Sequence, residues 1–411
     1  EFDYNKINTF KRRVLVKKRI TSLFIVFVML ITLTSCNESV KQWDGSIADE
    51  FGSGDGTESS PYEINDPSQL ALLAKQVNEG NVYSGKYFSL LCDIDLCNIE
   101  WTPIGNGTYG FEGIFDGNGH TVKNLKISVG ASYNRTYSSN NPDKTLPTYV
   151  SGLFGTCMNA TIKNLNIDNA HINIKYNSYK HTIYTGILCG AMYSEENTHI
   201  SNIKIFNSQI ETNFEQVNTP FTLFVGGAIG YAQHNELSAG TYTQIQADVC
   251  ISVEKGMSST NSIGGLVGAL ITHNTCTIEN ACSYLSVNLD KEQCYALDTF
   301  IGAFGSIQSS DELFFISNVF SAVEIDKVYD TFHGYPAYTA YAVIGDAYYP
   351  FSNDNSLSSG YSMENVFGYV EQTDKESGER RILTDLYKLP AMDFSQINCS
   401  GCESLPENNG F

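Results

Sequence analysis

Residues 263–268 read Ile263-Gly264-Gly265-Leu266-Val267-Gly268, an apolar strand closed by glycines. Related copies occupy residues 149–155, 184–190, 225–230, 301–305 and, in the weakest form, 343–347. The first glycine of each four-residue core is Gly152, Gly186, Gly227, Gly265, Gly302 or Gly345, so the steps are 34, 41, 38, 37 and 43 residues. Steps this regular predict stacked structural units.

A second strand signal keeps the same period. It consists of an apolar residue, an Asn two positions later, and an apolar-polar-apolar strand. The asparagines are Asn124, Asn164, Asn202, Asn280, Asn318 and Asn365. In the third interval residues 245–249 stand in, with Asp248 at the position expected for Asn. Two strand signals in each repeat exclude a helical array.

The two signals together predict the fold class. Alternating apolar residues give each strand one buried face, and Asn and Gly tolerate the left-handed backbone that a coil needs at a corner. Stacking places each Asn above the next, so the amides can hydrogen-bond along the stack. We therefore expect an all-β protein, a right-handed parallel β-helix of about six or seven coils. The polar, Tyr-rich stretches 132–144 and 333–341 are expected to protrude from it as loops.

The pattern resembles that of the GLUG-motif repeat proteins over about residues 54–370. The resemblance is strongest in residues 54–120, which include Pro61-Tyr62-Glu63-Ile64, Trp101-Thr102-Pro103-Ile104-Gly105 and Phe115-Asp116-Gly117-Asn118-Gly119. It implies a bacterial surface or secreted β-helix. Some such proteins are adhesin-like and others are attached to peptidase domains, so the resemblance is specific for architecture and poor for activity. Asp248, Gly345-Asp346-Ala347 and an inserted residue at Cys189 depart from the family's pattern.

The amino-terminal segment predicts export and a lipid anchor. A basic block between Lys11 and Arg19 precedes the apolar run Leu23–Leu33, which is too short for a spanning helix and fits a signal-peptide core. The following Leu33-Thr34-Ser35-Cys36 resembles a lipobox, with Cys36 as the lipidated residue. The alternative is a membrane anchor followed by an incidental cysteine. Asn37 favours the outer membrane or cell surface as the location, because it is not the acidic residue that holds some lipoproteins at an inner membrane.

Charge restricts the partners. Seven basic and two acidic residues precede Cys36, so the remainder carries 18 basic and 43 acidic residues and a formal net charge of −25. Nucleic acid is excluded as a partner on this ground, and contact with a membrane is expected through the lipid anchor alone. The expected organisation is a signal peptide (1–35), a flexible tether (36–60), an amino-terminal cap (61–100), β-helix repeats (101–370) and a carboxy-terminal cap or tail (371–411), in a monomer.

The amino-terminal cap is expected to contain one helix over residues 66–79. Asp66 is a helix N-cap, Pro67 stands at the first helical position, Gln69 is in capping-box register and Gly80 is a stop signal. Such a helix would cover the open edge of the first coil.

Ten cysteines remain after lipidation. Cys92/Cys97 and Cys399/Cys402 have spacings that permit a disulfide or half of a zinc site, whereas Cys157, Cys189 and Cys250 lie in or beside apolar strands, where a thiol packs inside. No second pair stands at finger-like spacing, so no metal and no cofactor are predicted.

Two acidic groups are weighed as catalytic candidates, because β-helix enzymes that cleave polysaccharides use paired carboxylates. Asp93 and Asp95 share a strand face, and Asp116 stands close to His120. The first pair falls in the cap and the second reads as a turn before a strand, so no catalytic residue is assigned.

The loops supply a different chemistry. Tyr, Ser, Asn and Gly offer rigid aromatic area with adaptable hydrogen bonding, which suits glycan or protein ligands. The alternative is that the tyrosines shield the loops. The favoured hypothesis is a cell-surface binding or adhesion module, and the second is a polysaccharide lyase or glycoside hydrolase. The loop tyrosines are Tyr133, Tyr137, Tyr176, Tyr179, Tyr329, Tyr335, Tyr338, Tyr341, Tyr348 and Tyr349.

Overall fold

The computed structural model describes the main part of the chain after residue 39. The described residues are 40–128, 131–136, 145–176, 182–214, 221–254, 258–289, 299–309, 314–326, 339–340, 344–348, 361–373 and 380–383. The described residues from Lys41 onward belong to one compact unit, and the account below concerns that unit. The segment predicted to be a signal peptide (1–35) and the predicted lipidation site Cys36 lie outside the described residues.

The described chain is almost entirely β-structure, arranged in two sheets. The first is a 15-stranded sheet. Its strands are β1 (Lys41–Gln42), β2 (Tyr62–Ile64), β3 (Tyr87–Leu90), β4 (Ile94–Asp95), β5 (Ile114–Asp116), β6 (Thr121–Lys123), β7 (Lys126–Ile127), β11 (Thr161–Asp168), β12 (His171–Tyr176), β15 (Thr198–Phe214), β18 (Gly240–Glu254), β20 (Cys276–Leu289), β22 (Phe314–Asp326), β25 (Tyr361–Thr373) and β26 (Arg380–Leu383).

The second is an 11-stranded sheet. Its strands are β8 (Ala131–Thr136), β9 (Thr145–Ser151), β10 (Phe154–Met158), β13 (Thr182–Gly186), β14 (Cys189–Ser194), β16 (Phe221–Gly226), β17 (Ile229–His234), β19 (Ser258–Thr272), β21 (Thr299–Ser309), β23 (Thr339–Ala340) and β24 (Ile344–Tyr348). The single described helix is α2 (Pro67–Asn78).

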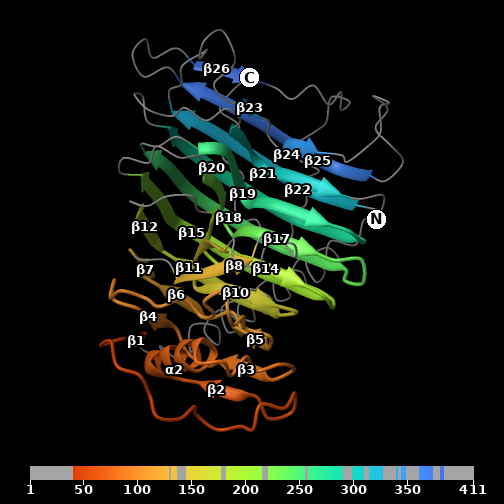
Figure 1. The fold of residues 1–411 in the computed structure, drawn as a ribbon. Coiled ribbons are helices and arrows are strands. Elements are labelled where there is room, and N and C mark those ends of the chain that lie inside the picture. The colour runs from red at the N-terminus through yellow and green to blue at the C-terminus, as the bar shows by residue number, and fades with distance from the viewer. Residues whose placement is uncertain are drawn as a thin grey trace, which may run out of the picture. The chain divides into compact units, whose positions relative to one another are not determined.

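The strands stack as a parallel β-helix, which confirms the predicted fold class. In the first sheet the order β6-β11-β15-β18-β20-β22-β25 follows the chain, and each neighbouring pair is parallel. Successive passes of the chain through the second sheet are also parallel, as in β14-β17-β19. Figure 1 shows these passes as successive layers between α2 and β26.

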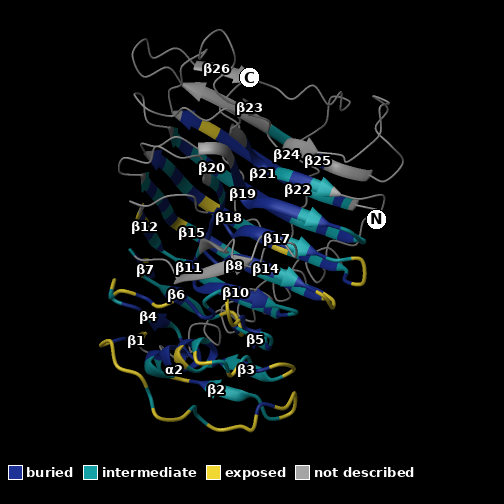
Figure 2. Ribbon diagram, viewed as in Figure 1, coloured by how far each residue is buried: buried dark blue, intermediate teal, exposed yellow. Residues whose placement is uncertain are grey.

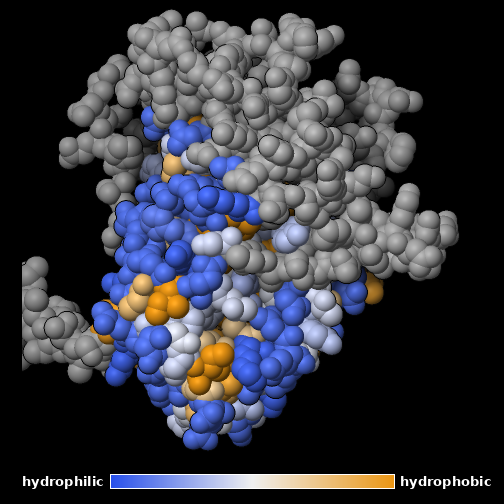
Figure 3. Space-filling model, turned by 60° about the vertical axis from the view of Figure 1, so that its left-hand side comes forward, coloured by the Kyte–Doolittle hydropathy of each residue, from blue (hydrophilic) through white to orange (hydrophobic). Residues whose placement is uncertain are grey.

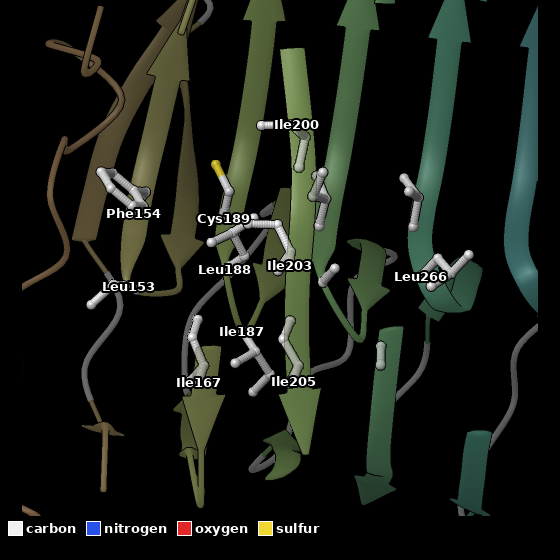
Figure 4. Packing of buried hydrophobic residues seen from close by; sticks show 14 of the residues in the cluster. Leu153, Phe154, Ile167, Ile187, Leu188, Cys189, Ile200, Ile203, Ile205 and Leu266 are labelled. Carbon is white, nitrogen blue, oxygen red and sulfur yellow. The ribbon is translucent and has the colours of Figure 1, made fainter. Parts of the chain in front are cut away.

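The interior between the two sheets is filled by one aliphatic column after another. In β11 and β15 the residues Ile162/Ile200, Leu165/Ile203 and Ile167/Ile205 are register partners and are fully buried. Ile187 and Leu188, at the turn of the second sheet, lie opposite Ile203 and Ile205 (Figure 4). Figure 2 shows buried residues alternating with partly exposed ones along the described strands. Each coil thus buries its apolar side chains against the coils above and below it.

Asparagines form the predicted left-handed corners, but in two columns. The first column contains Asn164, Asn202, Gln244, Asn280 and Asn318, all with φ between 51° and 55°. Gln244, not Asp248, is the register partner of Asn202, because Ile203 pairs with Ile245. The assignment of Asp248 to the Asn position was therefore wrong: a residue that accepts a positive φ was available four positions earlier.

The second column runs through Asn124, Asn169 and Asn207, with φ of 56°, 57° and 52°. Asn124 was aligned with Asn164 from sequence, but Val122 pairs with Ile167, which places Asn124 beside Asn169. This column ends at β18. A register shift between Ile205 and Ser208 removes one residue opposite Asn207, and β18, β20 and β22 continue as strands of 15, 14 and 13 residues.

The repeated glycines are required for close backbone packing and not for a left-handed backbone. None of the core glycines from Gly152 to Gly305 in the described residues has a positive φ. A Cβ on Gly226 would overlap the carbonyl oxygen of Ile229, and a Cβ on Gly268 would lie 2.7 Å from the backbone nitrogen of Val225. Gly186 pairs with Gly226, and Gly226 pairs with Gly264. The glycine that starts each core is therefore Gly186, Gly226 or Gly264, and Gly227 and Gly265 are second glycines within their cores. Cys189 is thus not an inserted residue.

The amino-terminal cap contains the predicted helix. The Asp66 side chain accepts a hydrogen bond from the Ser68 backbone, Pro67 begins α2 and Gly80 follows it with φ of 103°. Leu70, Leu73 and Val77 are fully buried in the main core. Gln69 bonds to the Asn65 backbone nitrogen at 2.9 Å instead of closing the expected capping box on Asp66.

Residues 41–60, expected to be a flexible tether, pack on the first coil. β1 pairs in parallel with β4. The Trp43 ring lies 5.5 Å from that of Trp101 at 71°, and its indole nitrogen donates to the Ser46 carbonyl at 2.8 Å. The Gly52 N–H donates to the Glu63 carbonyl at 2.9 Å, and the Glu63 N–H donates to the Ser53 carbonyl at 3.0 Å. The apolar surface of Trp43 explains this order, because burying an aromatic ring outweighs the polar composition around it.

Candidate binding surface

Of the two candidate pairs, Asp93/Asp95 and Asp116/His120, the structure brings together a different combination, because His120 lies against Asp93 on the outside of the first coils. The Oδ1 atom of Asp93 is 3.2 Å from Nδ1 of His120 and accepts a 3.0 Å bond from the Thr121 backbone. Both side chains remain about one third exposed, at 35% and 28%. The pair fixes the turn that brings the chain into β6, which is a structural role.

Asp95 and Asp116 terminate ladders of amide hydrogen bonds. Asn124 Nδ2 donates to Asp95 at 2.6 Å, and Asn169 Nδ2 donates to Asn124 at 2.6 Å. In the other column Asn164 Nδ2 donates to Asp116 at 3.0 Å. Asp116 also faces Lys163 at 3.3 Å. A carboxylate is a stronger acceptor than an amide, so it suits the end of a ladder. The structure thus brings Asp95 and Asp116 into the fold's own hydrogen bonding.

The cysteines lie mainly inside the coils. Cys157, Cys189 and Cys276 are fully buried, and burial raises the pKa of Cys157 and Cys276. Cys97 takes a positive φ of 54° and its thiol faces the Asp95 carbonyl at 3.6 Å, so it does not bond to Cys92. Cys294, Cys399 and Cys402 lie outside the described residues. Among the described residues, no group of three or more His, Cys, Asp or Glu side chains is placed to hold a metal ion.

A buried polar pair lies inside the middle coils. His234 Nε2 is 2.7 Å from the Tyr242 hydroxyl, which in turn faces the sulfur of Met192 at 3.8 Å. Both rings are almost completely buried. Burial lowers the pKa of His234 to about 4 and raises that of Tyr242 well above its usual value. The imidazole is therefore neutral at physiological pH and serves as a core residue.

The side chains of the ten loop tyrosines predicted to form a binding surface are not among those that the structure describes. The backbone of Tyr133, Tyr176 and Tyr348 lies in β8, β12 and β24 respectively. A different group of aromatic residues, which the sequence patterns did not indicate as a binding surface, lies on the second sheet.

We define this group as the aromatic corner: Val150, Tyr184, Ala191, Tyr193, Phe224, Tyr231, Ala269 and Ile271. These side chains form a cluster of their own, separate from the main interior. Their strand neighbours Ile183, Leu223 and Met192 belong to the main core, so by alternation the corner residues point outward.

The corner exists because each pass through the second sheet bends at its glycines. Val150, Tyr184 and Phe224 are register partners on the arm before the bend, and Ala191, Tyr231 and Ala269 are partners on the arm after it. A Cβ at Gly230 would lie 2.5 Å from the Thr185 backbone nitrogen, so the two arms touch there. The outer faces of the arms therefore turn toward each other.

The aromatic rings stack both across this bend and between neighbouring strands of one arm. The Tyr184 and Tyr231 ring centroids are 4.6 Å apart at 28°, and those of Tyr184 and Phe224 are 5.6 Å apart at 16°. Tyr193 lies 5.8 Å from Tyr231. The Tyr231 hydroxyl donates to Gln233 Oε1 at 3.0 Å.

The edge of the corner has the composition of a ligand surface. Tyr184 and Tyr231 are buried, but Tyr193, Phe224 and Ile271 are only partly buried. Tyr193, Gln233, Ile271 and Gln308 follow one another in a single row across β14, β17, β19 and β21. Ring faces next to amide side chains can contact the apolar face and the hydroxyl groups of a sugar, or a peptide.

The sequence contained a signal for this corner. Tyr184 stands two residues before Gly186, Phe224 stands two residues before Gly226, and Tyr231 follows Gly230 directly. The sequence alone does not show that these tyrosines and Phe224 meet, because periodicity does not indicate in which direction the chain bends at each glycine core.

No described helix is long and apolar enough to cross a membrane.

No known family model matches the chain. Halomucin of Haloquadratum walsbyi (strain DSM 16790 / HBSQ001) is 31% identical over 140 residues, which are 31% of this chain and 1% of halomucin. The chain thus spans a very small part of that relative. Among solved structures, the chain resembles one from Bacteroides ovatus provisionally named an immunoglobulin A1 protease. The TM-score is 0.36 at 16% identity, over 80% of this chain and 88% of the other.

Proposed function

We propose that the protein is an exported, lipid-anchored binding or adhesion module of the cell surface, with a glycan or a protein as its ligand. The observation that supports this function best is the aromatic corner. Its partly exposed Tyr193 and Ile271 flank Gln233 in one row of the second sheet, and the partly exposed Phe224 lies beside Tyr231. Side chains on stacked strands lose little conformational freedom on binding, which favours affinity.

The negative charge favours a neutral or basic ligand. With a net charge of −25 after the predicted signal peptide, the protein repels uronate polymers and other polyanions. Asp95 and Asp116 are engaged in the ladders and Asp93 in a turn, so these carboxylates support the fold. The GLUG-type resemblance, with its adhesin-like members, agrees with a binding role.

Binding can be tested with a panel of neutral glycans and surface proteins. The double variant Tyr193→Ala/Phe224→Ala should lower affinity for a ligand about tenfold or more, because aromatic anchors dominate interface energies. Tyr109→Ala is the matched control, because Tyr109 is 42% exposed and lies outside the corner. The melting temperature of each variant shows that the fold is kept.

Two results would count against the proposal. If the double variant and the control bound the ligand with equal affinity, the aromatic corner would not be part of the binding site. Release of new reducing ends or unsaturated products from a polysaccharide, lost on replacing acids in one cleft, would favour an enzyme instead.

The lipid anchor at Cys36 has a separate test. Cys36→Ala should move the protein from the membrane fraction to the soluble fraction, because a thioether-linked diacylglycerol is the proposed membrane attachment. Ser35→Ala is the control, and protease treatment of intact cells shows whether the body faces outward. Unchanged membrane association of Cys36→Ala would refute the anchor.

A further inference from the structure

A second outward-facing apolar cluster lies on the first sheet, in the coils nearest the carboxyl terminus. It consists of Cys282 and Tyr284 of β20 and Phe320 and Ala322 of β22. We call it the sheet patch. The Tyr284 and Phe320 ring centroids are 5.9 Å apart at 54°. The cluster is separate from the main interior core.

Neighbouring residues establish that the patch points outward. Ala281 and Leu285 belong to the interior cluster. Ser283 is fully buried, bonds to Ser321 at 2.9 Å, and its Oγ lies 2.5 Å from the position of a Cβ on Gly265 in the opposite sheet. Since side chains alternate along a strand, Cys282 and Tyr284 lie on the other face.

The patch is nevertheless buried, and its burial increases along the stack. Asp248 of β18 is exposed, its register partner Tyr284 is partly buried, and Ala322 beyond it is 7% exposed. In the neighbouring row Gln246 is partly buried, whereas Cys282 is 1% exposed and Phe320 is 4% exposed. The material that covers the patch therefore lies toward the carboxy-terminal coils.

The chain's own carboxy-terminal segment starts at the right place. The register continues from Phe320 to Phe367 and from Ala322 to Tyr369 in β25. β26 turns back antiparallel to β25 and ends at Leu383, the partner of Val370. The described strand β26 thus ends next to β25, the strand that carries Tyr369 and Phe367.

That segment also has suitable chemistry. Residues 384–411 include Leu386, Tyr387, Leu389, Met392 and Phe394, close together in sequence. Apolar side chains at this density can remove an apolar sheet face from water. We propose that the segment after Leu383 folds back over the outer face of the first sheet and covers the sheet patch.

Thiol labelling distinguishes this occupant from any other. Cys276 and Cys282 lie on the same strand, but Cys276 is in the main interior core and Cys282 is in the patch. The native full-length protein is treated with a maleimide and the label is located by mass spectrometry. Both thiols should be protected. In a variant that ends at Leu383, Cys282 should react about tenfold faster or more, and Cys276 should stay protected, since its burial does not depend on the segment.

Two additional arms extend this test: the first covers the case in which the shortened chain fails to fold, which reaction of Cys276 would reveal, and the second applies to a shortened chain that folds. Leu386→Asp/Tyr387→Asp in the full-length protein should expose Cys282 selectively. A peptide of residues 384–411 with Cys399→Ser and Cys402→Ser should restore protection to the shortened chain.

Two results overturn the proposal. Rapid labelling of Cys282 in the dilute full-length protein would show an open patch, available to a partner or a second copy. Protection of Cys282 in a folded chain without residues 384–411 would show that another part of the molecule covers it.

Discussion

At the scale of single residues, asparagine and glycine perform two different tasks. Asn164, Asn202 and Asn280 hold the positive φ of a corner, whereas Gly226 and Gly264 keep negative φ and give space for a neighbouring carbonyl. The sequence predicted both residue types at a regular step, but assigned the left-handed backbone to both. The repetition of a glycine does not show whether its φ or its missing Cβ is required.

His234 should make stability depend on pH. Burial lowers its pKa from 6.5 to about 4, so the unfolded state takes up the proton first as the pH falls. The free energy of unfolding is therefore unaffected above the unfolded pKa and should decrease by about 3 kcal/mol as the pH falls through this window.

The comparison of two variants isolates this effect. His234→Gln removes the titrating group, so its urea midpoint should fall less between pH of about 7 and about 4.5 than that of the wild type. His273→Gln replaces a partly exposed histidine and serves as the matched control. The same pH dependence in wild type and His234→Gln would contradict the assignment.

At the scale of elements, the ladders join one coil to the next. Asn202 Nδ2 donates to Asn164 Oδ1 at 2.9 Å, and Asn318 donates to Asn280 at 3.1 Å. The existence of an Asn column was predictable from the period. The second column was not, because Asn124, Asn169 and Asn207 belong to three segments of different local sequence.

Substitution of Asn202 separates its backbone and side-chain contributions. Asn202→Gly keeps the φ of 51° and removes the hydrogen bond, and should lower the free energy of unfolding by about 1 kcal/mol. Asn202→Ala removes the same hydrogen bond and also the polar side chain that lets Asn tolerate the left-handed region, and should cost about 2 kcal/mol. Urea denaturation measures both. Equal losses in the two variants would show that the corner geometry does not matter.

At the scale of the whole molecule, the sequence patterns were sufficient to predict the parallel β-helix but not to predict which side chains gather on its surface. Alternation and period predicted the parallel stack and α2, because both depend on local patterns. The aromatic corner depends on how far each glycine core bends, and the sheet patch depends on which residues of β20 and β22 share a register row. Neither quantity has a local signature.

The ladders also have a direction. In each described amide pair of the ladders the donor belongs to the later coil and the acceptor to the earlier one, and Asp95 and Asp116 stand at the acceptor ends. If the coils form in order from the amino terminus, each donor amide of these pairs meets an acceptor oxygen that an earlier coil already holds in place. If the coils formed from the opposite end, each donor amide would lack its acceptor until the preceding coil had formed.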